Sequence, residues 1–368
     1  MERIGIVGLP NAGKSSLFNA LTGGSAAVAP HPFSTTETTV GVARVADHRL
    51  DALAAMSASR KVVPATVELV DVAGLAAGAS TGEGLGNRFL AGLREADALC
   101  LVLRSFEDPN VPGGHEPADD LATLELELVL ADADAVASNL ERRRRAAKGD
   151  RAVAGEVAAL EAARDVLDAG TPLYRSELYR TELYRAGPGA DHCSALAPFA
   201  LLTAKPVLAV VNLGEDQLDQ AGALCKPVVD ELGESAEVLG VCVQLEAEAA
   251  RLEGPERAEL LEGLGLGDGA LPRVARAAYH LLGRRTFLTT GDKESRAWTF
   301  RAGARAPECA GVIHSDLQRG FIRAEVIGWE ELLALGSWSA AKAAGRLRVE
   351  GKDYEVADGD VLEIRFNV

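Results

Sequence analysis

The sequence predicts an α/β protein with a doubly wound, mostly parallel sheet, an inserted helical hairpin and a small C-terminal domain. Continuous apolar runs suit strands that are buried on both faces of a parallel sheet. Such runs recur at residues 4–7, 67–72, 98–103, 207–211 and 238–243. Helical patterns such as LREADA and DQLDQAGALCKPVVDEL separate these runs, as they do in doubly wound domains.

Two further regions interrupt or follow this alternation. Between residues 121 and 196, apolar side chains recur at steps of three and four on both sides of a turn signal at 148–150, which predicts an antiparallel helical hairpin. From residue 284 onward, glycines separate short mixed segments, and DYEVADGDVLEIRFNV predicts a closing β-hairpin. We therefore expect a discontinuous domain of residues 1–120 and 197–283, a hairpin at 121–196 and a β-rich domain at 284–368.

Composition limits the partners. The formal net charge of −16 and the sequence pI near 4.9 argue against non-specific coating of nucleic acid, so we expect no DNA partner. No run of about eighteen uncharged apolar residues occurs, so we expect no membrane partner. The five cysteines form no CxxC pair, which argues against a zinc site or a disulfide framework and favours a cytoplasmic protein.

The stretch GLPNAGKSSL directly follows the first predicted strand. Gly8, Gly13, Lys14 and Ser15 fit the pattern GxxxxGKS, and the next residues favour a helix. In such a P-loop, backbone N–H groups cradle the phosphates, the lysine reaches the β- and γ-oxygens, and the serine hydroxyl binds Mg²⁺. The sequence therefore predicts a P-loop NTPase.

Two later segments supply further phosphate and magnesium candidates. The strand VELVD ends at Asp71, which would hold Mg²⁺ through water, and Gly74 lies three residues later, where its N–H can reach the γ-phosphate. Between them and the P-loop lies HPFSTTETTVGV, where Thr35 could place its hydroxyl on the magnesium. Chemistry alone leaves the choice open among Thr35 and its hydroxyl-bearing neighbours, Ser34, Thr36, Thr38 and Thr39.

The base-reading segment is expected after the buried strand VLAVVN. Guanine-specific sites of this class carry NKxD there, and the Asp accepts two hydrogen bonds from guanine. Here the segment reads Asn212, Leu213, Gly214 and Glu215, so the lysine is missing and a longer carboxylate replaces the aspartate. Losing a paired hydrogen bond can lower discrimination by orders of magnitude, so the sequence argues against guanine specificity.

Three stretches together resemble the YchF-type Obg-like ATPases. They are GLPNAGKSS, then DVAGLAAGASTGEGLGNRFL with the following READ, and a C-terminal block of KESRAWTF, GVIHSDLQRGFIRAEVI and EGKDYEVADGDVLEIRFNV. The resemblance implies a P-loop domain, an inserted hairpin and a β-grasp-like TGS domain. It also implies an ATPase that prefers ATP to GTP and yields ADP and phosphate.

Carried over by position, the resemblance implies a set of nucleotide and metal contacts. The implied phosphate contacts are Asn11, Ala12, Gly13, Lys14, Ser15 and Ser16. The resemblance also selects Thr35 beside Ser15 as a magnesium contact, and it places adenine near Asn212, Leu213 and Glu215.

The catalytic group is less directly readable. Leu75 occupies the position where many related GTPases carry a glutamine that orients water, and leucine cannot do so. Lys14 is one catalytic candidate. The resemblance implies a second, a histidine in the loop FEDPNVPGGHEPADD, which is His115 here and is either catalytic or an exposed loop histidine. Because similar proteins with the loop GLPNxGKS can bind K⁺ beside the phosphates, the resemblance at Asn11 also implies the hypothesis that a K⁺ ion supplies positive charge there.

The resemblance implies ribosomes or ribosomal subunits as partners. The run Arg142 to Arg145 near the hairpin tip is either a basic contact surface or a solvated helix end. Two alternatives stay open: an Obg-type GTPase, and a non-hydrolysing scaffold in which nucleotide only orders loops.

Overall fold

The chain is described by a computed structural model that covers residues 2–23, 39–71, 85–108, 115–147, 151–179, 195–233, 236–252 and 254–367. It divides into two compact units. The first contains residues 1–43 and 67–282, and the second contains residues 44–66 and 283–368. The second unit thus includes a segment that the sequence analysis placed in the nucleotide-binding domain. The functional division into three domains stays a prediction.

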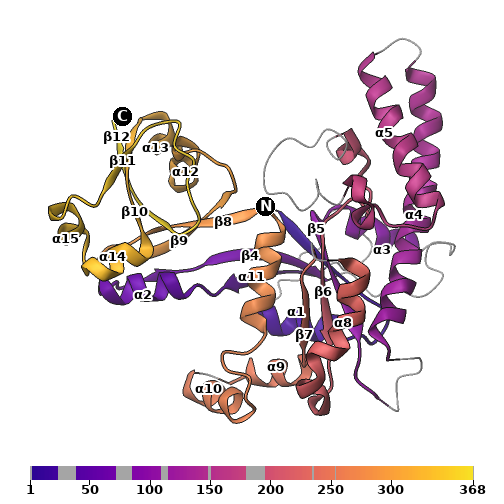
Figure 1. The fold of residues 1–368 in the computed structure, drawn as a ribbon, viewed down its shortest axis with the longest axis horizontal. Coiled ribbons are helices and arrows are strands. Elements are labelled where there is room, and N and C mark those ends of the chain that lie inside the picture. Colours follow the sequence, from indigo (N-terminus) through magenta and orange to yellow (C-terminus); the bar gives the residue numbers. More distant parts are fainter. Residues whose placement is uncertain are drawn as a thin grey trace. The chain divides into compact units, whose positions relative to one another are not determined.

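The first unit is built around a six-stranded sheet in the order β2-β4-β1-β5-β6-β7. Figure 1 labels β4, β5, β6 and β7 of this sheet. Its strands are β1 (Arg3–Val7), β2 (Thr39–Val45), β4 (Ala65–Asp71), β5 (Ala98–Arg104), β6 (Val207–Asn212) and β7 (Val238–Val241). The pairs β4-β1, β1-β5, β5-β6 and β6-β7 are all parallel. The predicted fold class is therefore confirmed. The strands β1 and β5 are buried along almost their whole length, as their continuous apolar sequences predict.

The first unit also contains α-helices. They are α1 (Lys14–Thr22), α3 (Leu85–Arg94), α4 (Pro117–Ala146), α5 (Arg151–Asp168), α8 (Ala221–Leu232), α9 (Val243–Ala249), α10 (Gly254–Gly263) and α11 (Leu271–Leu281). The described residues of this unit also form the 3₁₀ helices η1 (Leu173–Arg175), η2 (Ala197–Phe199) and η3 (Glu215–Gln220).

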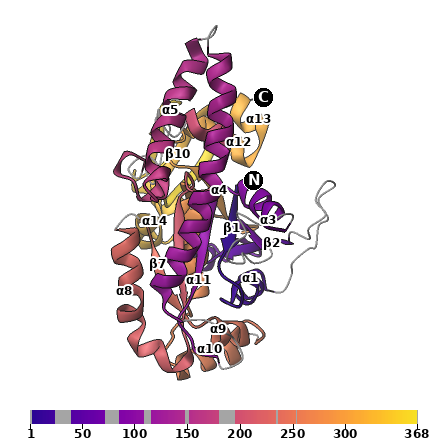
Figure 2. The ribbon, with the colours of Figure 1, turned by 90° about the vertical axis from the view of Figure 1, so that its right-hand side faces the viewer.

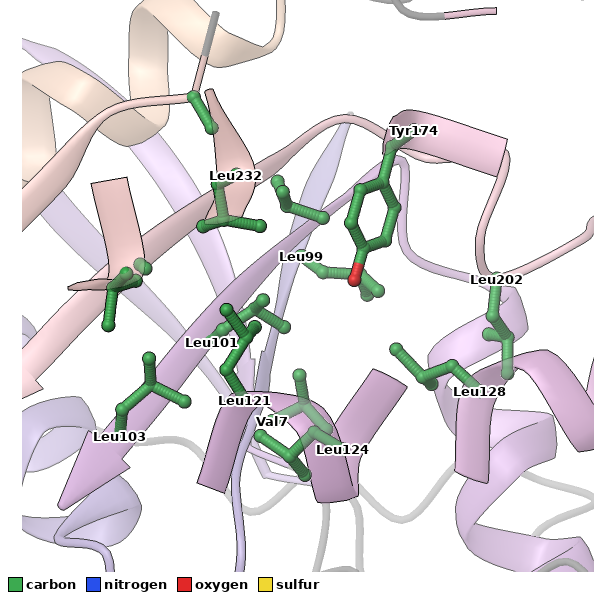
Figure 3. Packing of buried hydrophobic residues seen from close by; sticks show 14 of the residues in the cluster. Val7, Leu99, Leu101, Leu103, Leu121, Leu124, Leu128, Tyr174, Leu202 and Leu232 are labelled. Atoms are coloured by element: carbon green, nitrogen blue, oxygen red, sulfur yellow. The ribbon is translucent and has the colours of Figure 1, made fainter. Parts of the chain in front are cut away.

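The main core lies between the sheet and α4. Alternate residues of β5, namely Leu99, Leu101 and Leu103, point to the same face and pack with Leu121 and Leu124 of α4 (Figure 3). Each of these side chains is at most 1% exposed. Fully burying one leucine stabilises a fold by about 1.5–3 kcal/mol, so this cluster fixes the start of α4 firmly against the sheet.

The predicted hairpin is present as α4 and α5, which lie side by side and project from the sheet (Figure 2). The turn at 148–150 lies outside the described residues. The basic run of α4 forms ion pairs, because Arg143 contacts Glu156, Arg144 contacts Glu161 and Arg145 contacts Glu141. Carboxylates therefore neutralise part of the positive charge of the run Arg142 to Arg145, which the sequence analysis gave as a candidate basic contact surface.

A buried aspartate holds α4 to the rest of the first unit. Asp132 is 0% exposed and accepts hydrogen bonds from the backbone N–H groups of Leu202 and Thr203 and from the Thr203 hydroxyl, at 2.7–3.0 Å. Burial raises the pKa of Asp132, and these hydrogen bonds oppose that rise. Arg94 at the end of α3 lies 3.5 Å from the same carboxylate. The base of the hairpin is thus a closed polar cluster.

The second unit contains a mixed sheet in the order β11-β10-β12-β8-β9-β3. Its strands are β3 (Val62–Val63), β8 (Arg284–Thr289), β9 (Ser295–Arg301), β10 (Phe321–Gly328), β11 (Arg348–Glu350) and β12 (Asp360–Phe366). Its helices are α2 (His48–Met56), α12 (Ala306–Ile313), α13 (Ser315–Arg319), α14 (Trp329–Leu335) and α15 (Trp338–Ala343). The central strand β12 is parallel to β8 and antiparallel to β10, and α12 packs on the sheet, which is the expected β-grasp-like arrangement.

The prediction of a closing β-hairpin at residues 353–368 is wrong. β12 begins at Asp360 and pairs with β10 and β8. The segment before it makes one isolated bridge, between Arg305 and Glu355. Gly359 donates its N–H to Thr286 O at 2.8 Å, so the turn connects to another strand instead of folding back locally. Across the described residues, no helix is long and apolar enough to cross a membrane.

Candidate nucleotide site

A cavity of about 740 Å³ opens at the carboxyl ends of the parallel strands in the first unit. Open α/β sheets bind ligands at this edge, where the strand order reverses on either side of the first strand. The cavity lining comes from the segments that follow β1, β5, β6 and β7: Asn11, Gly13, Lys14, Ser15, Ser16, Phe106, Glu107, Asp108, Asn212, Leu213, Gly214, Glu215, Asp216, Cys242, Val243, Gln244, Ala247, Glu248 and Arg251.

The loop between β1 and α1 needs its glycines. A Cβ on Gly8 would lie 2.5 Å from the carbonyl oxygen of Val102 on β5, so any side chain would push the loop off the sheet. Gly13 precedes α1 with φ +97°, a left-handed conformation that suits glycine, and a Cβ there would lie 2.2 Å from Asn212 Nδ2. Asn11 adopts φ +63°, which asparagine tolerates better than most residues.

The loop directs the start of α1 toward the cavity. The first N–H groups of a helix have no partner inside the helix, and they attract anions together with the helix dipole. Lys14, the first residue of α1, is 7% exposed and donates from Nζ to Leu9 O at 2.8 Å. Burial lowers the pKa of Lys14, while the Asp71 carboxylate opposes this effect. The positive charge is thus held inside the loop, close to the helix start.

Ser15 and Asp71 come together across 56 residues of sequence. The Ser15 hydroxyl donates to Asp71 Oδ2 at 2.9 Å. Burial raises the pKa of Asp71, whereas the Ser15 hydrogen bond and the Lys14 charge lower it. The second carboxylate oxygen, Oδ1, is buried and has no hydrogen-bond partner among the residues that the structure describes.

This pair fits a magnesium ion. A hydroxyl and a carboxylate are the hard oxygen ligands that Mg²⁺ prefers, and the ion usually keeps several waters. A buried carboxylate oxygen without a partner costs free energy unless something satisfies it, and a metal-bound water can do so. The structure brings Ser15 and Asp71 together, and their role as magnesium ligands stays a prediction. Thr35, Gly74 and Leu75 lie outside the described residues.

At the other end of the cavity, Asn212 ties three segments together. Its Nδ2 donates to Ala12 O in the P-loop at 3.0 Å, and its Oδ1 accepts from the Val243 N–H at the start of α9 at 3.1 Å. Its backbone carbonyl accepts from Ser105 N at 2.9 Å and from Phe106 N at 3.3 Å. The side chain is 5% exposed, so Asn212 fixes the relative positions of the segments that surround the base end.

The two other predicted base contacts differ in environment. Leu213 is 2% exposed, and its N–H donates to Val241 O at 2.9 Å. Glu215, the first residue of η3, is exposed. Burial raises the pKa of the Cys242 thiol, and the negative charge of the Glu215 carboxylate adds to that rise. Both residues line the cavity.

Four of the predicted residues that the structure describes do not line the cavity: Gly8, Ala12, Asp71 and His115. Asp71 is joined to the lining through its hydrogen bond from Ser15. Gly8 and Ala12 support the loop from behind, Gly8 against β5 and Ala12 through its carbonyl bond with Asn212. His115 lies with its Nε2 3.3 Å from Glu107 Oε1, and these side chains are 42% and 78% exposed. Glu107 lines the cavity, so His115 is linked to its rim.

Sequence reasoning missed part of the lining. Glu248 and Arg251 contribute from the end of α9 and the residues after it, and no motif distinguishes them from ordinary helix-surface charges. Asp108 and Asp216 were also missed. Each follows a predicted strand by a few residues, so the rule that ligands bind at the strand carboxyl ends could have found them.

Comparisons with known proteins identify the family of this chain. Residues 3–133 match the family MMR_HSR1, described as 50S ribosome-binding GTPase, and residues 285–367 match YchF-GTPase_C, described as a protein of unknown function. The Ribosome-binding ATPase YchF of Bacillus subtilis (strain 168) is 44% identical over 371 residues, which cover 99% of this chain and 99% of that protein. The chain belongs to the YchF family.

Another family member, the Ribosome-binding ATPase YchF of Escherichia coli O157:H7, is 42% identical over 100% of this chain and 99% of that protein. Among solved structures, the Schizosaccharomyces pombe YchF GTPase superposes with a TM-score of 0.83 at 30% identity, covering 99% of this chain and 97% of that chain. A GTP binding protein from Pyrococcus horikoshii OT3 has a TM-score of 0.59 at 19% identity over the full length of both chains, which shows the shared fold alone.

Proposed function

We propose that this chain is a Mg²⁺-dependent P-loop hydrolase that binds ATP in preference to GTP and converts it to ADP and phosphate. The observation that carries the proposal is one cavity bounded at one end by Lys14 and Ser15 and at the other by Asn212, Leu213 and Glu215. Its YchF relatives from Bacillus subtilis and Escherichia coli O157:H7 are named as ATPases.

The residues at the phosphate end have distinct roles. The free N–H groups at the start of α1 hold the phosphate oxygens, and the buried Lys14 ammonium reaches the β- and γ-phosphates. Ser15 and Asp71 would hold Mg²⁺, Asp71 through water, together with Thr35. When bound, the ion supplies positive charge next to the phosphates, where negative charge develops during transfer.

The base end favours adenine because it lacks what guanine needs. A guanine site of the NKxD type uses a short carboxylate to accept two hydrogen bonds, but Glu215 is longer and exposed. The lysine position holds Leu213, which is 2% exposed and carries no charge. A site without the paired acceptor gains little from the guanine edge, whereas adenine does not depend on that acceptor.

For hydrolysis, a water molecule would attack the γ-phosphate in line while Lys14 holds the leaving phosphates. Gly74 would contact the γ-phosphate. Leu75 cannot orient the water, so His115 is the candidate for a catalytic group, and a K⁺ ion near Asn11 is the candidate for additional positive charge. ATPase rates that are equal in sodium and potassium buffers would remove the potassium hypothesis.

We further propose that the chain acts on ribosomes or ribosomal subunits in the cytoplasm. Its YchF relatives are named as ribosome-binding, and residues 3–133 match a family described as a 50S ribosome-binding GTPase. In this proposal the nucleotide state changes the affinity for the particle, as in other P-loop switches.

Calorimetry of ATP, ADP, GTP and GDP binding with Mg²⁺, together with phosphate release, tests the proposal. ATP should bind at least about tenfold tighter than GTP, and phosphate should be released. Equal or tighter GTP binding would favour the Obg-type GTPase. Binding without phosphate release above the no-enzyme rate, even with ribosomes present, would favour the non-hydrolysing scaffold.

A further inference from the structure

We propose that Gln217 is a positioning residue that sets the width of the base end of the cavity, and this inference rests on the proposed function. Gln217 lies in η3 and is half-buried. Its Nε2 donates to Ser105 O at 3.0 Å, and its Oε1 accepts from Gly214 N at 2.8 Å. One side chain thereby joins the loop after β5 to the loop after β6.

These two loops carry much of the base end of the cavity. Phe106, Glu107 and Asp108 line it from the first loop, and residues 213–216 line it from the second. Gln217 itself does not line the cavity. Its influence on a nucleotide must therefore pass through the residues that it holds in place.

Among the residues that the structure describes, the backbone hydrogen bonds between these loops lie near the loop starts. Asn212 is the last residue of β6, and its carbonyl oxygen accepts from the backbone N–H groups of Ser105 and Phe106. Two residues beyond it, a Cβ on Gly214 would lie 3.7 Å from the Phe106 Cβ, so the loops remain close there. Beyond the end of the sheet, the Gln217 amide joins the two loops by its hydrogen bonds to Ser105 O and from Gly214 N.

The chemistry of this bridge requires a primary amide. An amide side chain offers one acceptor and two donors on a single planar group, so it can receive an N–H and donate to a carbonyl at the same time. A carboxylate would keep the acceptor toward Gly214 N but would face Ser105 O without a proton to donate. The turn also holds Gln217 in place, since Gln217 N donates to Gly214 O at 3.1 Å.

The role predicts a specific kinetic signature. Loosening the two loops should weaken contacts to the base while leaving the P-loop, Lys14 and Ser15 unchanged. We expect Gln217→Ala to raise the Kd of Mg²⁺-ATP about tenfold, because the substitution removes both hydrogen bonds that hold the two loops together. Gln217→Glu should give a smaller rise, about threefold to fivefold, because one of the two bonds is kept.

The experiment measures three quantities on the full-length protein: the Kd of ATP and of GTP, kcat at saturating ATP, and displacement of a fluorescent nucleotide by inorganic tripolyphosphate. The expected result is weaker ATP binding, a smaller ATP-to-GTP preference, kcat within about twofold, and unchanged competition by tripolyphosphate. Gln220→Ala, an exposed glutamine at the end of the same short helix, is the matched control and should match the wild type.

Two outcomes would overturn the inference. In the first, Gln217→Ala and Gln217→Glu both bind ATP like the wild type. In the second, tripolyphosphate weakens in parallel with ATP, which would mean that the substitution disturbs the whole site. If Gln217→Ala fails to fold, Gln217→Glu decides by the same criteria. Failure of the proposed function is distinguishable, because the wild type itself would then not prefer ATP or release phosphate.

Discussion

The two ends of the nucleotide cavity are built in different ways. The phosphate end depends on a short continuous stretch, where Gly8, Gly13 and Lys14 form the loop and begin the helix. The base end is assembled from three separate loops, after β5, β6 and β7, and is held by side-chain amides of Asn212 and Gln217.

The P-loop is encoded by neighbouring residues, whereas the base end is assembled from residues that are distant in sequence. In the proposed function, backbone conformation and helix N–H groups do most of the binding at the phosphate end, so we expect changes there to be severe and independent of the base. At the base end, we propose that each residue contacts one edge of the nucleotide. Changes there should be smaller and should alter selectivity more than total binding.

The largest expected effect comes from Gly13→Ala. An added Cβ would sit 2.2 Å from Asn212 Nδ2, at a residue whose φ of +97° is unfavourable for alanine. We expect affinity for every purine triphosphate to fall more than about 100-fold, measured by titration with a fluorescent nucleotide. Gly23→Ala at the other end of α1 is the control, because φ is also positive there, at +62°, but no atom lies within 4 Å of the added Cβ.

The control should leave nucleotide affinity within about twofold, although it should lower stability by roughly 1 kcal/mol. Wild-type affinity in Gly13→Ala would contradict the view that the phosphate end depends on this conformation.

The next effect is that of Asp71→Asn. Loss of the carboxylate should weaken Mg²⁺-ATP binding about 10- to 100-fold, because the outer ligands of a metal typically contribute this much. Binding of ATP in excess chelator should change far less. If both conditions weaken equally, Asp71 acts on the loop and has no specific relation to the metal.

The same variant tests the electrostatics of Asp71 in the nucleotide-free protein. Burial raises the Asp71 pKa in the folded state, so its contribution to stability is complete below the unfolded-state pKa and is lost as pH rises through the folded-state pKa. Denaturation curves should therefore show the wild type losing stability relative to Asp71→Asn as pH rises through that window. A pH-independent difference would contradict the raised pKa.

A smaller effect is expected from Leu213→Lys combined with Glu215→Asp, which restores the guanine-reading pattern at the base end. We expect the ratio of ATP to GTP affinity to shift toward GTP by about tenfold, with tripolyphosphate competition unchanged. Leu213 is 2% exposed, so the lysine must extend along the cavity wall, and Glu215→Asp alone serves as the comparison. An unchanged ratio would mean that other residues select the base.

The smallest effect on affinity should be that of His115→Ala. Its contact with Glu107 is largely exposed, and such pairs contribute about 0–1 kcal/mol, so the Kd of ATP should stay within about twofold. A fall in kcat of about 100-fold at that unchanged affinity would identify His115 as the catalytic group. An unchanged kcat would mean that His115 is an exposed loop histidine without a catalytic role.

The sequence predicted most of the first unit because its signals are local. The runs that became β1, β4, β5, β6 and β7 are nearly continuous in apolar residues, and α4 and α5 show helical spacing. The prediction failed where partners are distant in sequence. Residues 44–66 belong to the second unit because Leu50 and Leu53 of α2 are buried there, next to segments more than 200 residues away.

The sequence by itself determined the P-loop and the start of α1, since a glycine with positive φ, a lysine and a serine follow one another directly there. The tertiary structure then brought Asp71 to Ser15. Only the tertiary structure decided the base end, including the link from Gln217 to Ser105 across 112 residues. The physical reason is that backbone conformation is set by neighbouring residues, whereas the distance between two loops is set by the packing of the strands that carry them.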